Sequence, residues 1–291
     1  MVIGKRKKTL SKPDFDRGRQ MNWHLRTAKS LLKKVWPQFS VAQKAIWAID
    51  SATPDSYQMT AAANFSIGTK LLDPKPKGIL FDLDGVLINS EPVHEFTLLE
   101  LSERFGRRFK DAELLPFKGL PERSMARAFQ RIFPNLTLSI DEIIGLRLEQ
   151  LRRHFDRIQM IPGALSFLQK AKAEGFHLGL TTSAPRSMQV LACETFALSS
   201  YFEAVITGDD IELGKPDPEP YVRTAAKLAL QTNECMVVED AVNGVLSGKA
   251  AGCFVVAITT SFPPVPLESA GADLIVPSFS ALEANLFAKP S

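Results

Sequence analysis

From residue 77 onward, short apolar runs alternate with segments long enough to form helices. The runs cover residues 78–81, 176–180, 204–206, 236–238, 254–258 and 274–276, and helix candidates lie between them at 163–174, 187–197, 218–229 and 242–251. Apolar runs of this length, separated by helical segments, are typical of a parallel sheet that helices cover on both faces. We therefore predict an α/β fold, in which ligands bind at the carboxyl ends of the strands.

The stretch between residues 90 and 160 follows a different pattern. Apolar residues recur there at helical spacing, as in Met125, Phe129 and Phe133, and no strand-like run is evident. We predict four or so helices that form an all-helical insertion after the first strand. Such an insertion beside the carboxyl edge of a sheet is typical of a lid over a ligand site.

The first 76 residues differ from the rest in charge. They hold fourteen Lys and Arg against five Asp and no Glu, a net charge of +9, whereas residues 77–291 hold twenty-one against twenty-seven acids, a net charge of −6. Residues 25–49 are basic with apolar residues at helical spacing, which suits a membrane surface, an organelle address or nucleic-acid phosphates. We favour a plain basic extension: a mobile tail, or a start codon assigned upstream of Met21 or Met59.

Several classes of protein are disfavoured. No window of about eighteen uninterrupted apolar residues occurs, so a membrane span is not expected. The three cysteines, Cys193, Cys235 and Cys253, show no paired metal-ligand spacing and cannot form a disulfide framework. We expect a cytoplasmic monomer without integral membrane association and without a nucleic-acid partner, although the basic extension keeps organelle targeting open.

Two aspartates two residues apart, Asp82 and Asp84, follow the first apolar run and precede Gly85. Neighbouring carboxylates repel each other, so such a pair needs a compensating charge. A bound Mg²⁺ supplies one, because hard cations take carboxylate oxygens as ligands. An ordinary strand end followed by an acidic turn is the alternative explanation for this pair.

Three further groups of polar residues lie at or after strand ends. Thr182 and Ser183 place hydroxyls after the second run, and Lys215 lies on a Pro-flanked turn that precedes a helix. Glu239 and Asp240 follow the fourth run. Each group is weak evidence alone. Because the carboxyl ends of parallel strands lie along one edge of a sheet, the four groups together predict a single site.

The order and identity of these groups resemble the haloacid dehalogenase-like superfamily of phosphotransferases. Residues 81–86 resemble its first motif, Thr182 its second, Lys215 its third and the pair Glu239 and Asp240 its fourth. The resemblance covers about residues 77–280. Residues 89–94 and the insertion after them are similar to the branch that contains β-phosphoglucomutase and many small-sugar phosphatases.

The resemblance implies a domain organisation. A Rossmann-like catalytic core, with helices on both faces of a parallel sheet, would comprise residues 77–91 and 160–291. An all-helical cap would comprise residues 92–159. The basic amino-terminal extension, residues 1–76, would lie outside both.

The resemblance also implies a role for each acid. Asp82 would be the nucleophile that forms an aspartyl-phosphate, and Asp84 would act as a general acid and then as a base. Mg²⁺ would bind Asp82, the backbone carbonyl of Asp84, and Asp240, with Glu239 supporting the metal site. The metal would allow an anionic nucleophile to approach an anionic phosphate.

Cationic and hydroxyl groups would complete the site. By the same resemblance, Thr182 would donate a hydrogen bond to the phosphoryl oxygens with help from the amide of Ser183, and Lys215 would offset negative charge. In the cap, His94, Lys118 and Arg123 would contact the substrate, the two cations suiting a sugar hydroxyl or a second phosphate. The alternatives are that His94 is an ordinary surface histidine on the first cap helix and that Arg123 pairs with Glu122 or Glu113 on the surface.

Three functions remain open from the sequence. The first is a Mg²⁺-dependent phosphatase of small phosphorylated metabolites, of which sugar phosphates are the expected class. The second is a β-phosphoglucomutase-type transferase, which differs in how well the closed lid excludes water. The third is a scaffold that has inherited the fold. We favour the phosphatase, because the cap loop around Lys118 does not match the mutase pattern cleanly.

Overall fold

The computed structural model describes residues 75–114, 117 and 122–287. Six parallel strands form its main sheet, in the order β5-β4-β1-β6-β7-β8. The strands are β1 (Gly78–Phe81), β4 (His177–Thr181), β5 (Ala204–Ile206), β6 (Cys235–Glu239), β7 (Phe254–Ile258) and β8 (Leu274–Val276). Each of the six predicted runs forms one of these strands, so the predicted parallel sheet is confirmed.

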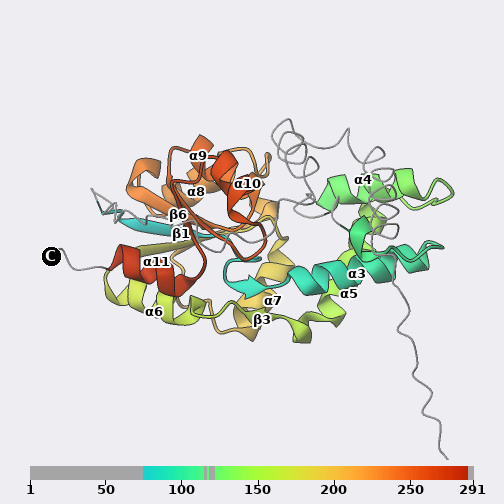
Figure 1. Ribbon diagram of the computed structural model, residues 1–291, viewed down its shortest axis with the longest axis horizontal. Helices are drawn as coiled ribbons and strands as arrows, with labels where there is room; N and C mark the ends of the chain where they lie inside the picture. Colours follow the sequence, from blue (N-terminus) through green and yellow to red (C-terminus); the bar gives the residue numbers. More distant parts are fainter. Residues whose placement is uncertain (1–74, 115–116, 118–121, 288–291) are drawn as a thin grey trace, which may run out of the picture.

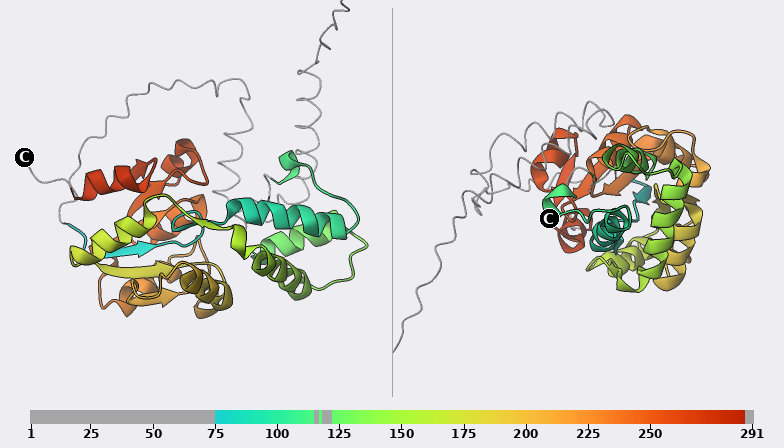
Figure 2. Two further views of the ribbon diagram at one scale, coloured as in Figure 1. Left: turned by 90° about the horizontal axis from the view of Figure 1, so that it is seen from below. Right: turned by 90° about the vertical axis from the view of Figure 1, so that its right-hand side faces the viewer.

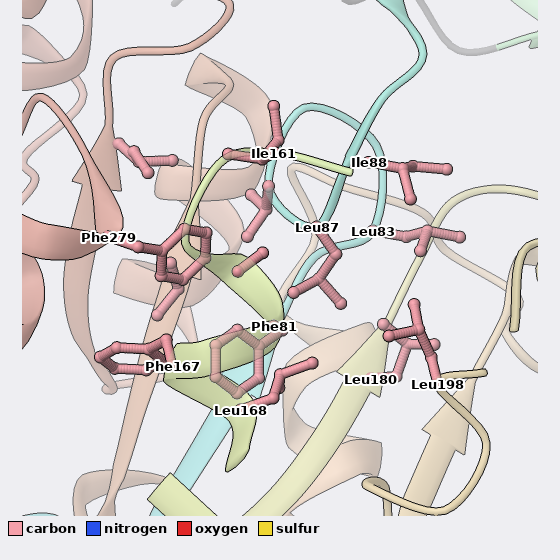
Figure 3. Close-up of a cluster of buried hydrophobic side chains, with 14 of the residues drawn as sticks. Phe81, Leu83, Leu87, Ile88, Ile161, Phe167, Leu168, Leu180, Leu198 and Phe279 are labelled. Carbon is pink, nitrogen blue, oxygen red and sulfur yellow. The ribbon is translucent and has the colours of Figure 1, made fainter. Parts of the chain in front are cut away.

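Helices cover both faces of the sheet, as predicted (Figure 1). One face carries α6 (Ala164–Ala173), α7 (Arg186–Thr195) and α11 (Phe279–Leu286), and the other carries α8 (Glu219–Lys227), α9 (Val242–Ala250) and α10 (Pro264–Ser269). Alternate residues of each strand face opposite sides. Phe81 therefore packs against Phe167 in one core cluster (Figure 3), whereas Leu80 belongs to the cluster of Tyr221 on the other face.

The insertion is helical and stands off one end of the sheet (Figure 2). Its α-helices in the described residues are α3 (Glu91–Arg104), α4 (Glu122–Ile132) and α5 (Ile140–Arg153), fewer than the four or so predicted. Single 3₁₀ turns at Asp111–Glu113 and Phe155–Arg157 account for part of the difference; two more lie in the core at Gly208–Asp210 and Thr232–Glu234. The helices enclose their own apolar cluster around Phe129, whose ring contacts Phe105, Phe109, Phe117 and Phe133.

Two very short strands join the core to the insertion. β2 (Ile88–Asn89) and β3 (Gln159–Met160) pair antiparallel, with Ile88 opposite Met160. The amide of Ile161 also donates to the carbonyl of Leu87 at 2.9 Å. No strand was predicted in this stretch, because the two residues of β3 are too few to show an alternating or apolar run.

The predicted amphipathic segment at residues 25–49 lies outside the described residues. Within the described ranges, no helix combines the length and the apolar character that crossing a membrane requires.

Candidate active site

A cavity of about 860 Å³ lies between the carboxyl edge of the sheet and the helical insertion. Volumes of this size are typical of small-molecule sites. Nine of the predicted site residues line it: Asp82, Asp84, His94, Arg123, Thr182, Ser183, Lys215, Glu239 and Asp240. The tenth, Lys118, lies outside the described residues. The four predicted groups thus meet in one place, since they follow neighbouring strands of the sheet.

Asp82 and Lys215 form a buried ion pair at the centre of this edge. Asp82 follows β1 directly, and Lys215 lies in the connection from β5 to α8. The Lys215 Nζ donates to Asp82 Oδ1 at 2.6 Å, and only 7% of the lysine side chain is exposed. Burial raises the pKa of Asp82 to about 7, with Glu239 and Asp84 adding to this effect and Lys215 opposing it. Three buried acids, Asp82, Glu239 and Asp240, lie beside the single ammonium of Lys215, so this edge of the sheet carries an excess of negative charge.

The excess charge comes from three buried carboxylates. Asp82, Glu239 and Asp240 each offer one oxygen, and these oxygens lie within 4.8 Å of one another. Burial, together with the charges of Glu239 and Asp82, holds the pKa of Asp240 well above its ordinary value. A cluster of oxygen donors with surplus negative charge fits a hard divalent cation such as Mg²⁺. Asp84, by contrast, is not part of this cluster.

Glu239 is held from both sides. Its Oε1 accepts hydrogen bonds from Lys215 Nζ and from the hydroxyl of Tyr221, each at 2.6 Å. Its Oε2 accepts from the backbone amides of Asp240 and Ala241. Gly244 makes room for this carboxylate, because a Cβ there would lie 1.8 Å from Glu239 Oε1. With its oxygens engaged in this way, Glu239 suits the supporting role expected of it better than direct ligation.

The neighbouring carboxylates give Lys215 an unusual environment. Burial alone would lower the pKa of Lys215, but the charges of Asp82 and Glu239 raise it above its ordinary value. The ammonium also donates to the carbonyl of Thr181 at 3.1 Å and lies 4.9 Å from the centre of the Tyr221 ring. Lys215 is therefore a fixed cation at this edge of the sheet.

Asp84 faces a different set of partners. Its Oδ1 accepts a hydrogen bond from the hydroxyl of Ser90 at 2.6 Å and lies 3.7 Å from Nε2 of His94. Burial would raise the pKa of Asp84, but His94 and Ser90 lower it below its ordinary value. The pKa values of Asp82 and Asp84, only two residues apart, are therefore shifted in opposite directions. Pairs of this kind are typical of acid–base sites.

Two hydroxyl-bearing residues that follow β4, Thr182 and Ser183, also line the cavity. Thr182 is buried at the end of β4, where its amide donates to the carbonyl of Ile206 at 2.9 Å. Its Oγ1 accepts from the amide of Ala184 at 3.0 Å, which leaves the hydroxyl proton available to a ligand. Ser183 is exposed on the cavity wall beside it.

The turn after Asp84 brings the backbone close to the acids. Gly85 has a φ of +77°, and a Cβ there would lie 1.8 Å from Asp240 Oδ2. Its carbonyl accepts from Thr260 Oγ1 at 2.5 Å, and Ser261 hydrogen-bonds Asp240. Only glycine combines this conformation with this close approach.

A chain of side chains links Asp84 to the cap. Arg147 on α5 donates from Nη2 to His94 Nδ1 at 2.7 Å and from Nη1 to Glu122 Oε1 on α4. Arg123, expected to contact substrate, lines the cavity and pairs with Asp141 at 2.9 Å, with 64% of its side chain exposed. The alternative pairing predicted for Arg123, with Glu122 or Glu113, is not the one found, because Glu122 pairs with Arg147 and Glu113 with Arg107.

Sequence reasoning missed five residues of this site: Ser90, Glu122, Arg147, Tyr221 and Ser261. Ser90 lies within the stretch that resembled the family, so its place between Asp84 and the cap was available as a signal. The other four lie on helices or on a further strand end, and nothing in their local sequence sets them apart from ordinary surface or core residues.

Comparison with known proteins agrees with this geometry. The sequence profile of haloacid dehalogenase-like hydrolases matches residues 79–258. The chain is 32% identical over 195 residues to validoxylamine A 7'-phosphate phosphatase of Streptomyces hygroscopicus subsp. limoneus, covering 67% of this chain and 91% of that protein. It is 35% identical over 185 residues to hexitol phosphatase A of Escherichia coli, covering 62% and 82%.

A solved structure has the same architecture. The structure of a candidate β-phosphoglucomutase from Thermotoga maritima superposes with a TM-score of 0.60 at 26% identity, covering 72% of this chain and 97% of that one. The matched profile spans more than half of the chain and includes the edge of the sheet where the acids meet. The chain belongs to the haloacid dehalogenase-like hydrolases and is an enzyme that acts on phosphate esters.

Proposed function

We propose that the protein is a Mg²⁺-dependent phosphatase of small phosphorylated metabolites, with sugar or polyol phosphates as its substrate class, and that it works through an aspartyl-phosphate on Asp82. The observation that carries the proposal is the arrangement around Asp82. One carboxylate has Lys215 at 2.6 Å, two further acids within 4.8 Å and the Thr182 hydroxyl on the same cavity wall. This arrangement presents a nucleophile, fixed positive charge and a hydrogen-bond donor to one phosphoryl group.

Phosphoryl transfer to Asp82 would use these groups in turn. The Asp82 carboxylate attacks phosphorus while the bond from phosphorus to the ester oxygen breaks. The Thr182 hydroxyl donates to a phosphoryl oxygen, and Lys215 offsets charge on the nucleophile and on the phosphoryl group. Bound at the acid cluster, Mg²⁺ would supply charge neutralisation between the anionic nucleophile and the anionic phosphate. The residues to hold it would be Asp82, Asp240 and the backbone carbonyl of Asp84, with Glu239 supporting the site and orienting Lys215.

Asp84 would act as the general acid and then as the general base. The lowered pKa of Asp84 keeps it ionised, so it begins as the acceptor of the Ser90 hydrogen bond, with His94 Nε2 3.7 Å away. A phosphate dianion beside it raises its pKa, because like charges favour the protonated form. The protonated Asp84 then gives its proton to the departing ester oxygen, and later takes one from the water that hydrolyses the Asp82 phosphoester.

The relatives support the substrate class. Validoxylamine A 7'-phosphate phosphatase and hexitol phosphatase A are both named for phosphate esters of hydroxyl-rich molecules. The alternative is a β-phosphoglucomutase-type transferase, which the likeness to the Thermotoga maritima structure favours. The two activities differ in the acceptor of the phosphoryl group, water or sugar.

The test is phosphate release from a panel of sugar and polyol phosphates with Mg²⁺, for wild type and Asp82→Asn. We expect wild type to turn over and Asp82→Asn to lose essentially all activity, because an amide cannot form the phosphoester. A matched control is Asp209→Asn, an acid outside the cavity. Near wild-type release by Asp82→Asn would overturn the covalent route. Sugar isomerisation that needs a bisphosphate activator, without phosphate release, would favour the transferase.

A further inference from the structure

The cap end of the cavity contains an ion pair between a buried arginine and a partly buried glutamate. Arg147 has only 7% of its side chain exposed, and its Nη1 donates to Glu122 across the gap between α5 and α4. Its Nη2 forms a hydrogen bond with Nδ1 of His94 at 2.7 Å. Because a guanidinium has no acceptor, His94 Nδ1 must be the acceptor in this contact, and the ring proton then lies on Nε2, toward Asp84.

The described cations at this end are already matched by carboxylates. Beyond Asp82, Asp84, Glu239 and Asp240, the cavity lining contains five acids, Glu91, Glu95, Asp111, Glu122 and Glu212, against the two arginines Arg123 and Arg147. Arg147 faces Glu122, and Arg123 faces Asp141. An anionic group arriving here would have to compete with a carboxylate for either guanidinium. Separating Arg147 from Glu122 is costly, because it leaves a guanidinium that is only 7% exposed without its partner. The exposed pair of Arg123 and Asp141 resists such competition much less.

The same pair retains hydrogen-bonding capacity. Arg147 Nε and Glu122 Oε2 are both buried and have no partner within the described structure, and both residues line the cavity. A hydroxyl group satisfies both kinds of atom, since it accepts from an N–H and donates to a carboxylate. Leu99, Leu148 and Leu151 lie on the same wall and suit the C–H faces of a carbon chain or ring.

We propose that the Glu122–Arg147 pair selects phosphate monoesters whose leaving group is an uncharged polyol, and rejects leaving groups that carry a carboxylate or a second phosphate. The inference rests on the proposed phosphatase function and adds which leaving group that site accepts. It follows that the negative charge of Glu122 repels anionic leaving groups, and that the positive charge of Arg147 weakens this repulsion.

The test compares two substrates that differ only at the far end of the leaving group. Glucitol 6-phosphate has a hydroxymethyl group at C1, and 6-phosphogluconate has a carboxylate there. Since the transferred phosphoryl group is the same, effects on the chemical step cancel in the ratio of the two kcat/KM values. We expect the full-length wild type to prefer glucitol 6-phosphate by about tenfold or more, a free-energy difference of about 1.4 kcal/mol.

Two variants should move this ratio in opposite directions. Glu122→Gln removes the rejecting charge and exposes Arg147, so the preference should fall about tenfold. Arg147→Gln leaves Glu122 without its counter-charge, so the preference should rise. Glu149→Gln is the matched control: Glu149 lies on the exposed side of α5, pairs with Arg153 and does not line the cavity. Its ratio should equal that of wild type.

The outcomes separate this inference from the proposed function. A wild type that hydrolyses p-nitrophenyl phosphate but shows a ratio near one, or variants that leave the ratio unmoved or shift it in the same direction, would overturn the selectivity and keep the phosphatase. A wild type that releases no phosphate from any ester would overturn both. If Glu122→Gln fails to fold, the wild-type ratio and the Arg147→Gln ratio still decide.

Discussion

The two ends of the cavity are built by different means. At the phosphate end, the backbone of the sheet fixes the side chains: the Asp82 amide donates to Val238 and the Thr182 amide to Ile206. At the cap end, His94, Glu122 and Arg147 come from α3, α4 and α5 and meet only through their side chains. Damage at the phosphate end should therefore reduce turnover for every substrate, whereas damage at the cap end should change which substrate is preferred.

Removal of the metal is the most severe way to test the phosphate end. Dialysis against EDTA should abolish phosphate release from every substrate, and added Mg²⁺ should restore it, because Asp82, Glu239 and Asp240 share one buried cluster. The assay is phosphate release before and after chelation, with the rate ratio of two sugar phosphates measured after restoration. Full turnover after exhaustive chelation would contradict a metal-dependent phosphate end.

Asp84→Asn should have the next largest effect. An activated aryl phosphate needs little protonation of its leaving group, so the variant should still form phosphoenzyme. Hydrolysis of that phosphoenzyme should slow by about 10²–10⁴-fold, the usual contribution of a general base. Rapid-quench measurement of the two half-reactions checks this. Mg²⁺ affinity serves as the control, and an equal loss of both half-reactions with intact Mg²⁺ binding would argue against the assigned role.

Two glycine-to-alanine substitutions, one at the phosphate end and one in the cap, compare how tightly the two parts are packed through their effects on the free energy of unfolding. Gly244→Ala in α9 would push a methyl group into the Glu239 carboxylate, at 1.8 Å, and should cost about 1–3 kcal/mol. Gly145→Ala in α5 meets nothing within 4 Å and should stabilise the protein by about 0.5–1 kcal/mol. Urea unfolding of both variants beside wild type measures the difference. Equal effects at the two positions would mean that Glu239 is not held as tightly as described.

Deletion of the basic extension should have the smallest effect. A chain that begins at Pro74 keeps Lys75, whose Nζ lies 4.8 Å from the centre of the Phe176 ring, and Lys77, which pairs with Glu234. We expect it to fold and to keep turnover within a few-fold of the full chain. The comparison is turnover and thermal midpoint of the two chains. An insoluble product, or a midpoint many degrees lower, would mean that the proposed domain boundary at residue 76 is wrong.

The phosphate end could be predicted from the sequence because its residues follow apolar runs at one edge of a sheet. The predicted run at 236–238 falls short of β6, which extends through Glu239. A buried glutamate is not expected in a strand, and here the hydrogen bonds from Lys215, Tyr221 and two amides compensate for its burial. Tyr221 itself has no local signal, since its contact with Glu239 depends on how α8 packs on the sheet.

The cap end could be predicted only in part. His94 was found from its resemblance to a family pattern, and it does line the cavity. Arg147 was not found, because a charged residue on an amphipathic helix is ordinarily solvated. Its burial arises from the packing of α3, α4 and α5, which no spacing within one helix reveals.

The paired strands β2 and β3 have a mechanical consequence. Both crossings between the core and the cap run side by side, joined at Ile88 and Met160, so they act as one strap with a single bending axis. Any swing of the cap about that strap displaces distant atoms more than near ones. His94, five residues beyond Asn89, lies close to the strap along the chain, so a small swing would change its 3.7 Å approach to Asp84 less than the positions of the far ends of the cap helices. Such a movement leaves the contact between His94 and Asp84 largely in place while the outer parts of the cap open or close the cavity.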